Sequence, residues 1–289
     1  MHAEAAPAKL NLSLAVVGRR EDGFHDLVSL VVPLELSDEL TFEPAAAWSL
    51  RCDDTDVPSD ATNLVLRAAE AYARARPDCP RGHFMLSKRI PSGAGLGGGS
   101  SDAAAALRLL DRASGAPRGP EFLAAVAAEV GSDCPFFIRR EPAVMRGRGE
   151  RIEPLGVAPR RALAGRRVLV VKPPFGVPTP EAYALFARHG APRSPAQAEA
   201  LLSAWLARPE SDPSQLGNDL EPPVFRKFLA LSVGLEAAGT ATGQGFRMTG
   251  SGSAGFCLVR GEPDVDALRS VLRRCWGPDA WVIETRIAA

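Results

Sequence analysis

Hydrophobic and polar residues alternate regularly near the start of the chain. Over residues 8–17, apolar side chains occupy every second position, and Lys9 and Asn11 fall on the opposite side. This period of two is typical of a β-strand with one apolar face. After a polar loop at 19–26, the apolar stretches at 27–36 and 40–42 predict further strands in antiparallel pairing.

The rest of the chain mixes helical and strand patterns. Residues 63–75 place Leu64, Ala68 and Ala71 on one face, which predicts an amphipathic helix. The other predicted helices cover 100–110, 121–130, 180–188, 195–207, 223–238 and 265–276. The other predicted strands cover 84–90, 136–139, 143–151, 167–172, 245–249, 255–260 and 280–286. This mixture predicts an α+β protein with helices on one face of a sheet.

A stretch rich in glycine, proline and arginine, at 156–165, is the predicted domain boundary. We therefore expect an N-terminal domain over 1–160 and a C-terminal domain over 161–289.

Bulk composition excludes several classes of protein. The 34 basic and 34 acidic residues cancel, so no global field favours nucleic acid or an anionic membrane. No apolar run reaches the roughly 18 residues of a membrane span. Glu4 and Lys9 argue against a signal peptide. The five cysteines show no CxxC spacing, so we expect neither a disulfide framework nor a zinc site, and a cytoplasmic protein.

A glycine-rich segment lies between a predicted strand and a predicted helix. It consists of Pro91, Ser92, Gly93, Ala94, Gly95, Leu96, Gly97, Gly98, Gly99, Ser100 and Ser101. Glycines let the backbone approach a phosphate, and the N-terminus of the following helix adds unpaired N–H donors and a positive dipole end. The serine hydroxyls can contact phosphate oxygens or a phosphate-bound Mg²⁺. The segment therefore predicts a phosphate-binding loop, such as one that holds the phosphates of a nucleotide.

Two other nucleotide-binding loops do not fit this segment. A Walker A loop requires Lys-Ser/Thr after its last glycine, where this chain has Ser-Ser-Asp. The glycines do satisfy GxGxxG, but a dinucleotide fold also needs a second strand that ends in an acid about 20 residues on. Here that region, 115–119, is a loop rich in glycine and proline. A flexible linker is the remaining alternative, but linkers rarely lie between a strand and a strong helix former.

Beyond the glycine-rich segment, the chain contains the motifs PAKLNLSL from Pro7, DGFHDL from Asp22, NLVLRAA from Asn63, GSDCPFF from Gly131, PTPEAY from Pro178, GNDLE from Gly217 and MTGSGSAGF from Met248. With these motifs, the chain resembles the GHMP superfamily of small-molecule kinases. Within it, the chain is most similar to the 4-diphosphocytidyl-2-C-methyl-D-erythritol kinases of non-mevalonate isoprenoid biosynthesis. The glycine-rich segment and the last motif are shared by the whole superfamily. The motifs PAKLNL, DGFH and GSDCPFF together narrow the resemblance to this one kinase family within it.

The resemblance implies a fold and an activity. It implies an N-terminal domain like ribosomal protein S5 and a ferredoxin-like C-terminal domain. It implies phosphorylation of the 2-hydroxyl of the cytidylyl substrate, with ATP and Mg²⁺. The family's catalytic pair falls on Lys9 and Asp133. Asp133 would accept the proton of the attacking hydroxyl, and Lys9 would stabilise the developing negative charge.

The resemblance also implies which residues bind the substrates. Phe24 and Tyr183 match the aromatic positions that sandwich the cytosine, and His25 matches the residue that reads its polar edge. Further matches to substrate-binding positions are Asn11, Thr179, Gly250, Ser251 and Gly252, and Asn63 matches a nucleotide contact. Phe24 replaces a more frequent tyrosine, so stacking survives while any bond from a phenol oxygen is lost. Ala94 stands where glycine is often found, so one extra methyl group must fit beside the phosphates.

Two alternatives remain open. The chain could be another GHMP kinase of the homoserine or mevalonate type, although such substrates lack a base for an aromatic clamp. It could also be a non-catalytic, ligand-sensing relative, although such a protein would be free to lose Lys9 and Asp133. The expected partners are small molecules, not nucleic acid or membrane, and the expected state is a monomer or weak homodimer.

Overall fold

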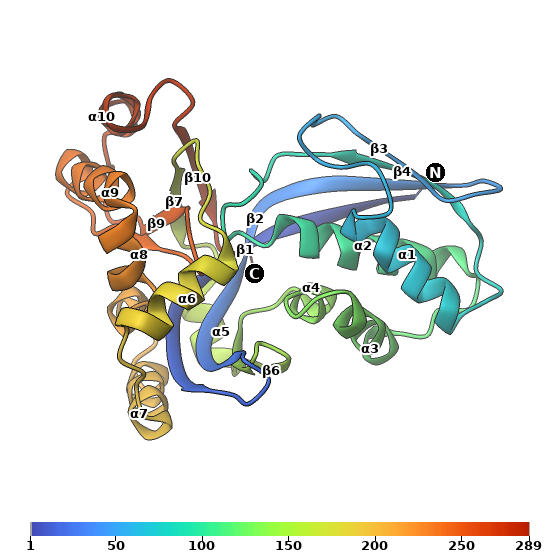
Figure 1. The fold of residues 1–289 in the computed structure, drawn as a ribbon, viewed down its shortest axis with the longest axis horizontal. Helices are drawn as coiled ribbons and strands as arrows, with labels where there is room; N and C mark the ends of the chain where they lie inside the picture. Colours follow the sequence, from blue (N-terminus) through green and yellow to red (C-terminus); the bar gives the residue numbers. More distant parts are fainter. Residues whose placement is uncertain (1, 289) are drawn as a thin grey trace. The chain divides into compact units, whose positions relative to one another are not determined.

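The structure is a computed structural model that describes residues 2–288. The chain forms two compact units (Figure 1). Unit 1 comprises the segment that ends at Lys9, Pro33–Ser92 and Gly97–Glu141. Unit 2 comprises Leu10–Val32, Gly93–Leu96 and the residues from Pro142 onward. Each unit is therefore assembled from segments that are distant in the sequence.

Two long strands contribute residues to both units, namely β1 (His2–Arg19) and β2 (His25–Pro44). In unit 1, β2 pairs antiparallel with β4 (Gly82–Ser87), and β4 pairs parallel with β3 (Ser49–Cys52). The apolar stretches at 27–36 and 40–42, predicted as separate strands, belong to this single strand β2.

Four helices complete unit 1, and Figure 1 shows α1 and α2 along one side of its strands. They are α1 (Leu64–Ala75), α2 (Gly98–Ala113), α3 (Pro120–Val130) and α4 (Cys134–Arg139). The largest enclosed side chains of this unit are aromatic: Phe42, Tyr72, Phe84, Phe136 and Phe137. Burial of an aromatic side chain of this kind contributes about 1.5–3 kcal/mol. The hydroxyl of Tyr72 donates to Asp111 at 2.9 Å, so its polar end is also satisfied.

Unit 2 contains the first half of β2, which pairs antiparallel with β5 (Ala143–Gly147). Strand β5 pairs in turn with β6 (Arg151–Pro154). A separate four-stranded antiparallel sheet has the order β10-β7-β9-β8. Its strands are β7 (Arg167–Lys172), β8 (Arg247–Met248), β9 (Gly255–Leu258) and β10 (Trp281–Arg286).

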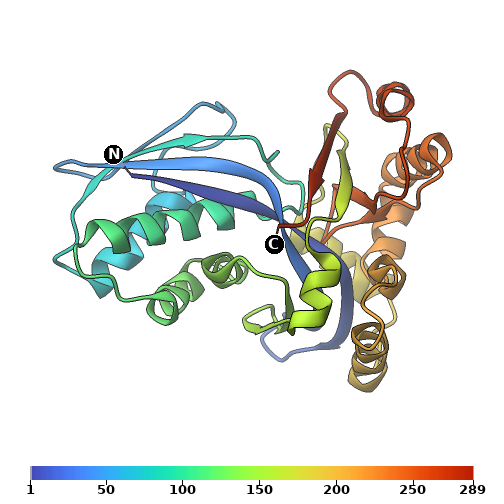
Figure 2. The ribbon, with the colours of Figure 1, turned by 180° about the vertical axis from the view of Figure 1, so that it is seen from behind.

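The helices of unit 2 are α5 (Val157–Leu163), α6 (Thr179–His189), α7 (Pro195–Leu206), η1 (Pro213–Leu216), α8 (Glu221–Lys227), α9 (Leu229–Thr242) and α10 (Val265–Trp276). Of these, α6, α8, α9 and α10 share a core with one face of the four-stranded sheet, and Figure 2 shows this unit from behind. The core joins Leu169 and Val171 of the sheet with Leu235 of α9 and Leu268 of α10. Leu14, from β1, belongs to the same core.

The structure corrects some of the predicted elements. Residues 136–139, predicted as a strand, belong to helix α4. Pro135 lies in the first turn of that helix, where proline fits because the missing N–H would have no helical partner. The predicted strand at 143–151 is the hairpin of β5 and β6, and the predicted boundary loop at 156–165 contains helix α5. The domain division at residue 160 stays a prediction.

The mixture of helices with largely antiparallel sheets confirms the α+β class. Across residues 2–288, the structure contains no helix with the length and apolar character that a membrane crossing requires.

Candidate active site

Lys9 and Asp133, the predicted catalytic pair, lie together in unit 1. Nζ of Lys9 is 3.9 Å from Oδ2 of Asp133, and the side chain of Asp133 is 43% exposed while that of Lys9 is 8% exposed. Burial lowers the pKa of the Lys9 ammonium, and the charge of Asp133 opposes that shift. The pair therefore combines an enclosed cation with a carboxylate that a substrate hydroxyl can reach.

A tight turn positions Asp133. It is the N-cap residue of α4, and Pro135 follows in the first turn. The N–H of Cys134 donates to the carbonyl oxygen of Gly131 at 3.1 Å, which closes the turn around Asp133. Because Asp133 lies outside the regular helix, its carboxylate is not covered by a preceding helical turn.

Gly97 brings the glycine-rich segment against this pair. Its φ is 73°, and a Cβ atom built there would lie 2.7 Å from the Phe137 ring and 3.1 Å from Cγ of Lys9. Glycine is required both by this φ and by the close approach. Gly97 is also the N-cap of α2, and no side chain in the described part of the chain caps that end. The first N–H groups of α2 can therefore donate to an anion.

The middle of the glycine-rich segment, Gly93–Leu96, belongs to unit 2. The carbonyl oxygen of Ala94 accepts the N–H of Ala254 at 3.0 Å. A Cβ atom on Gly95 would lie 2.8 Å from the carbonyl oxygen of Thr249. These contacts hold the segment against the second predicted glycine turn, which contains Gly250, Ser251 and Gly252. The methyl group of Ala94 is buried there, at 2% exposure.

The remaining predicted nucleotide residues differ in how they are engaged. Asn63 caps α1: its Oδ1 accepts the N–H of Val65 at 2.8 Å, and its Nδ2 donates to the carbonyl oxygen of Pro58 at 2.7 Å. Its side chain thus already has protein partners. The hydroxyl of Ser101 is buried and has no hydrogen-bond partner among residues 2–288. Burial raises the pKa of the Cys134 thiol, beside Asp133, and the hydroxyl of Ser100 partly opposes that rise.

The polar residues predicted to bind the substrate lie in unit 2. Nδ2 of Asn11 donates to Oγ of Ser29 at 2.7 Å, and the N–H of Asn11 donates to Oγ1 of Thr249 at 2.8 Å. The hydroxyls of Thr179 and Ser251 are 2.9 Å apart. Asn11 lies in β1, and both faces of that strand are buried around it, although the sequence pattern suggested one apolar face only.

Aromatic side chains gather elsewhere in unit 2. The rings of His25 and Tyr183 are stacked, with centroids 5.2 Å apart. The ring of Phe24 is 53% exposed, and the guanidinium of Arg148 lies over it, 4.5 Å from the ring centroid. Burial and the charge of Arg19 lower the pKa of His25, so its ring is neutral near neutral pH. The structure therefore pairs His25 with Tyr183, and Phe24 with Arg148.

A buried charge cluster beside the glycine-rich segment escaped the sequence analysis. Nζ of Lys88 lies 2.5 Å from Asp38 and 2.8 Å from Asp102. It is also 3.2 Å from the position that a Cβ atom on Gly98 would take. Lys88 is one of four lysines in the sequence, but nothing in the spacing of Asp38 and Asp102 indicates that they share a partner.

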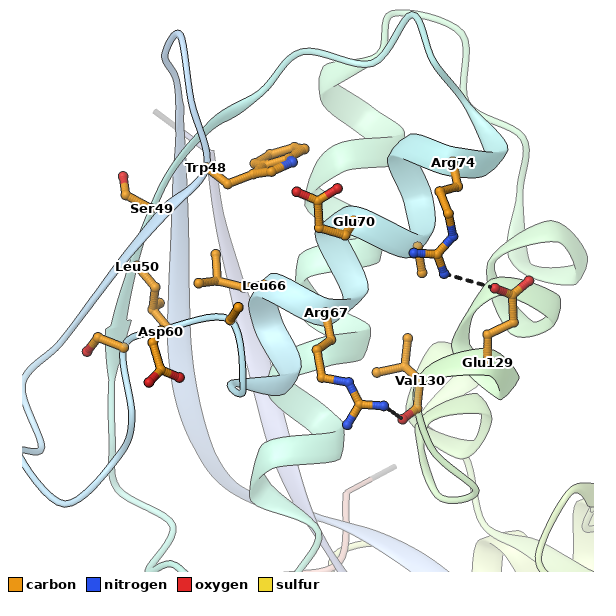
Figure 3. Close-up of a pocket in the computed structure, with 13 residues that line it drawn as sticks. Trp48, Ser49, Leu50, Asp60, Leu66, Arg67, Glu70, Arg74, Glu129 and Val130 are labelled. Carbon is orange, nitrogen blue, oxygen red and sulfur yellow. Dashed lines mark hydrogen bonds and ion pairs between the residues drawn. The ribbon is translucent and has the colours of Figure 1, made fainter.

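A separate pocket of about 570 Å³ lies along α1 in unit 1. Figure 3 shows Trp48 and Leu66 on its wall, with Arg74 paired to Glu129 at 3.3 Å. None of the residues that line it is a predicted site residue. Its lining residues do, however, flank the predicted nucleotide residue Asn63 in the sequence, at 59–61 and 66–67.

The chain has clear relatives among known proteins. Residues 63–141 match the family described as GHMP kinases N terminal domain. The chain is 38% identical to 4-diphosphocytidyl-2-C-methyl-D-erythritol kinase from Pelotomaculum thermopropionicum, over 97% of this chain and 96% of that protein. It is 41% identical to the protein of the same name from Thermus thermophilus, over 96% of this chain and 94% of the relative.

A solved structure agrees with these relatives. The crystal structure of a 4-(cytidine 5'-diphospho)-2C-methyl-D-erythritol kinase superposes with a TM-score of 0.76 at 38% identity, and the match covers 99% of each chain. The resemblance seen in the motifs and the GHMP kinase fold are thus confirmed. The chain belongs to the 4-diphosphocytidyl-2-C-methyl-D-erythritol kinase family, within the GHMP kinases.

Proposed function

We propose that this chain transfers the γ-phosphoryl group of ATP to the 2-hydroxyl of 4-diphosphocytidyl-2-C-methyl-D-erythritol. The observation that carries this proposal is the 3.9 Å approach of Lys9 Nζ to Asp133 Oδ2, beside Gly97 of the glycine-rich segment. Direct transfer of a phosphoryl group to a hydroxyl requires a general base, a cation and an anion-binding site such as a helix N-terminus.

The proton and the phosphoryl group then follow a simple route. The substrate hydroxyl gives its proton to Asp133 while its oxygen attacks the γ-phosphorus, and the bond from that phosphorus to the β,γ-bridging oxygen breaks. Lys9 stabilises the negative charge that develops on the attacking oxygen. Because the charge of Lys9 is already enclosed, it acts in a medium of lower effective dielectric constant than water.

The N–H groups of the glycine-rich segment and of the first turn of α2 would hold the phosphates. The residues present also fit a magnesium ion, which takes oxygen ligands from one or two protein side chains and from the phosphates. The carboxylate of Asp133 and the unpartnered hydroxyl of Ser101 are the oxygens that we assign to it. When bound, Mg²⁺ would neutralise charge on the phosphate oxygens.

Phe24, His25 and Tyr183 would hold the cytosine. Aromatic faces bind a base by stacking without a need for charge. A neutral His25 has one donor and one acceptor nitrogen, which suits the polar edge of a base. Homoserine and mevalonate contain no nucleobase that could stack on these side chains.

One assay tests the proposal against its alternatives. ADP release is measured with the cytidylyl substrate, and with homoserine and mevalonate as controls. We expect turnover with the cytidylyl substrate alone, and a product that carries the phosphate on the 2-hydroxyl. Turnover with homoserine or mevalonate instead would assign the chain to another substrate class. Binding of the cytidylyl substrate without ADP release would identify a ligand-sensing protein.

We also propose a monomer or weak homodimer that acts on small molecules without nucleic acid. The equal numbers of basic and acidic residues support the absence of nucleic acid, because they leave no net charge to attract a polyanion. Sedimentation at several protein concentrations tests the oligomeric state.

A further inference from the structure

Arg148 makes a contact in unit 2 that the catalytic proposal does not use. Its guanidinium lies 4.5 Å from the centroid of the Phe24 ring. Phe24 is 53% exposed, so a ligand can reach its ring. A cation above one face of this ring leaves the opposite face as the one that can stack on a ligand.

The turn between β5 and β6 is built to present Arg148. Gly147 has a φ of 68°, and a Cβ atom there would overlap the carboxylate of Glu150. That carboxylate accepts the N–H of Arg148 at 2.6 Å. The N–H of Gly149 also donates to the carbonyl oxygen of Arg146 at 3.1 Å. The backbone around Arg148 is thus fixed from both sides.

The turn between β1 and β2 presents Phe24 in the same way. Oδ1 of Asp22 accepts the N–H of Phe24 at 3.1 Å, and the N–H of Arg20 donates to the carbonyl oxygen of Phe24 at 2.8 Å. Oδ2 of Asp22 lies 3.8 Å from a guanidinium nitrogen of Arg148. One carboxylate therefore contacts both members of the pair.

We propose that Arg148 is a positioning residue for the cytidylyl substrate, which acts by holding the Phe24 ring in place for stacking on the base. This inference rests on the proposed function. The effect of Arg148 should therefore fall on binding of the base and not on phosphoryl transfer.

The test compares Arg148→Ala with Arg151→Ala, which removes an exposed arginine on the neighbouring strand β6. KM for the cytidylyl substrate, KM for ATP and kcat are measured for each, and equilibrium binding of the cytidylyl substrate is measured without ATP. A partly exposed cation–π contact predicts a roughly two- to fivefold rise in KM and Kd for the cytidylyl substrate in Arg148→Ala. kcat and KM for ATP should stay unchanged, and Arg151→Ala should match the wild type.

A double-mutant cycle shows whether Arg148 acts through the ring. In a Phe24→Leu background, Arg148→Ala should have no further effect on KM, because the ring that it holds is gone. Equal effects of Arg148→Ala in both backgrounds, or no effect in either, would overturn the inference. Failure of the wild-type chain to turn over the cytidylyl substrate would instead overturn the proposed function.

Discussion

Nζ of Lys88 lies 2.8 Å from Oδ2 of Asp102, and the side chains of these residues are 7% and 4% exposed. Oδ1 of Asp38 also accepts the backbone N–H groups of Arg89 and Ile90, at 2.6 and 2.8 Å. Asp38 thus holds the chain where it enters the glycine-rich segment. Through Lys88 it also holds Asp102, where the chain leaves that segment in α2. The ends of the segment are tied together by one enclosed network.

This network predicts a pH-dependent contribution to stability. Burial raises the pKa of Asp102 to about 7. Between about pH 4 and 7 the folded chain then holds a proton that the unfolded chain releases, so stability falls as pH rises through this window. The Asp102→Asn variant has no carboxyl group to titrate at this position. Between about pH 5 and 7.5 its free energy of unfolding should therefore fall by less than that of the wild type, and the difference should be on the order of 1 kcal/mol.

Urea unfolding of both proteins at the two pH values checks this prediction. Asp56→Asn, at an exposed position, should follow the wild type at each pH. Parallel stability curves for Asp102→Asn and wild type would contradict the raised pKa.

Asp133→Asn should remove the general base while it keeps the shape of the site. We expect kcat to fall by about 10²- to 10⁴-fold. The Kd for ATP measured without Mg²⁺ should stay nearly unchanged, because Asp133 lies outside the glycine-rich segment that would hold the phosphates. Steady-state kinetics and calorimetric ATP binding measure both effects, and Glu129→Gln serves as the control for loss of an exposed carboxylate. Turnover at the wild-type rate would remove Asp133 from the mechanism.

Gly97→Ala and Gly93→Ala form a matched pair. Their φ angles are 73° and 64°, so both substitutions carry backbone strain. A Cβ atom at Gly97 would collide with Phe137 and approach Lys9, whereas one at Gly93 would meet no described atom within 4 Å. We therefore expect Gly97→Ala to lower kcat/KM for ATP far more than Gly93→Ala. Equal losses would show that strain, and not the close approach to Lys9, is responsible.

The thiol of Cys134 should be unreactive toward alkylating reagents, although Cys134 directly follows Asp133 in the sequence. Burial raises the pKa of its thiol to about 11, and its side chain has no exposed surface. Only the thiolate reacts with iodoacetamide, so Cys134 should stay unlabelled in the native protein at about pH 8. Mass spectrometry should find label first on Cys52 and Cys275, which are half-buried. Early labelling of Cys134 with loss of activity would contradict this.

Sequence patterns predicted the parts of this protein that depend on local chemistry. Glycine spacing indicated a phosphate-binding loop, and the motifs around Lys9 and Asp133 pointed to a pair that the structure places 3.9 Å apart. Tertiary pairing could not be predicted in this way. Lys88 and Asp38 are separated by 50 residues, and only the packed fold shows that they meet. The short helix α4 was missed because its six residues are too few to display a helical period.

Strands β1 and β2 have a consequence for any attempt to divide the protein. Leu14 and Val16 of β1 belong to the same core as Leu169 and Val171 of β7. Cleavage after Glu141 would leave Leu14 and Val16 on the N-terminal fragment. The C-terminal fragment would then expose the apolar surface of β7 that these two side chains cover. The separated fragments should aggregate when expressed alone, and they should recover a native fold only by complementation when they are mixed.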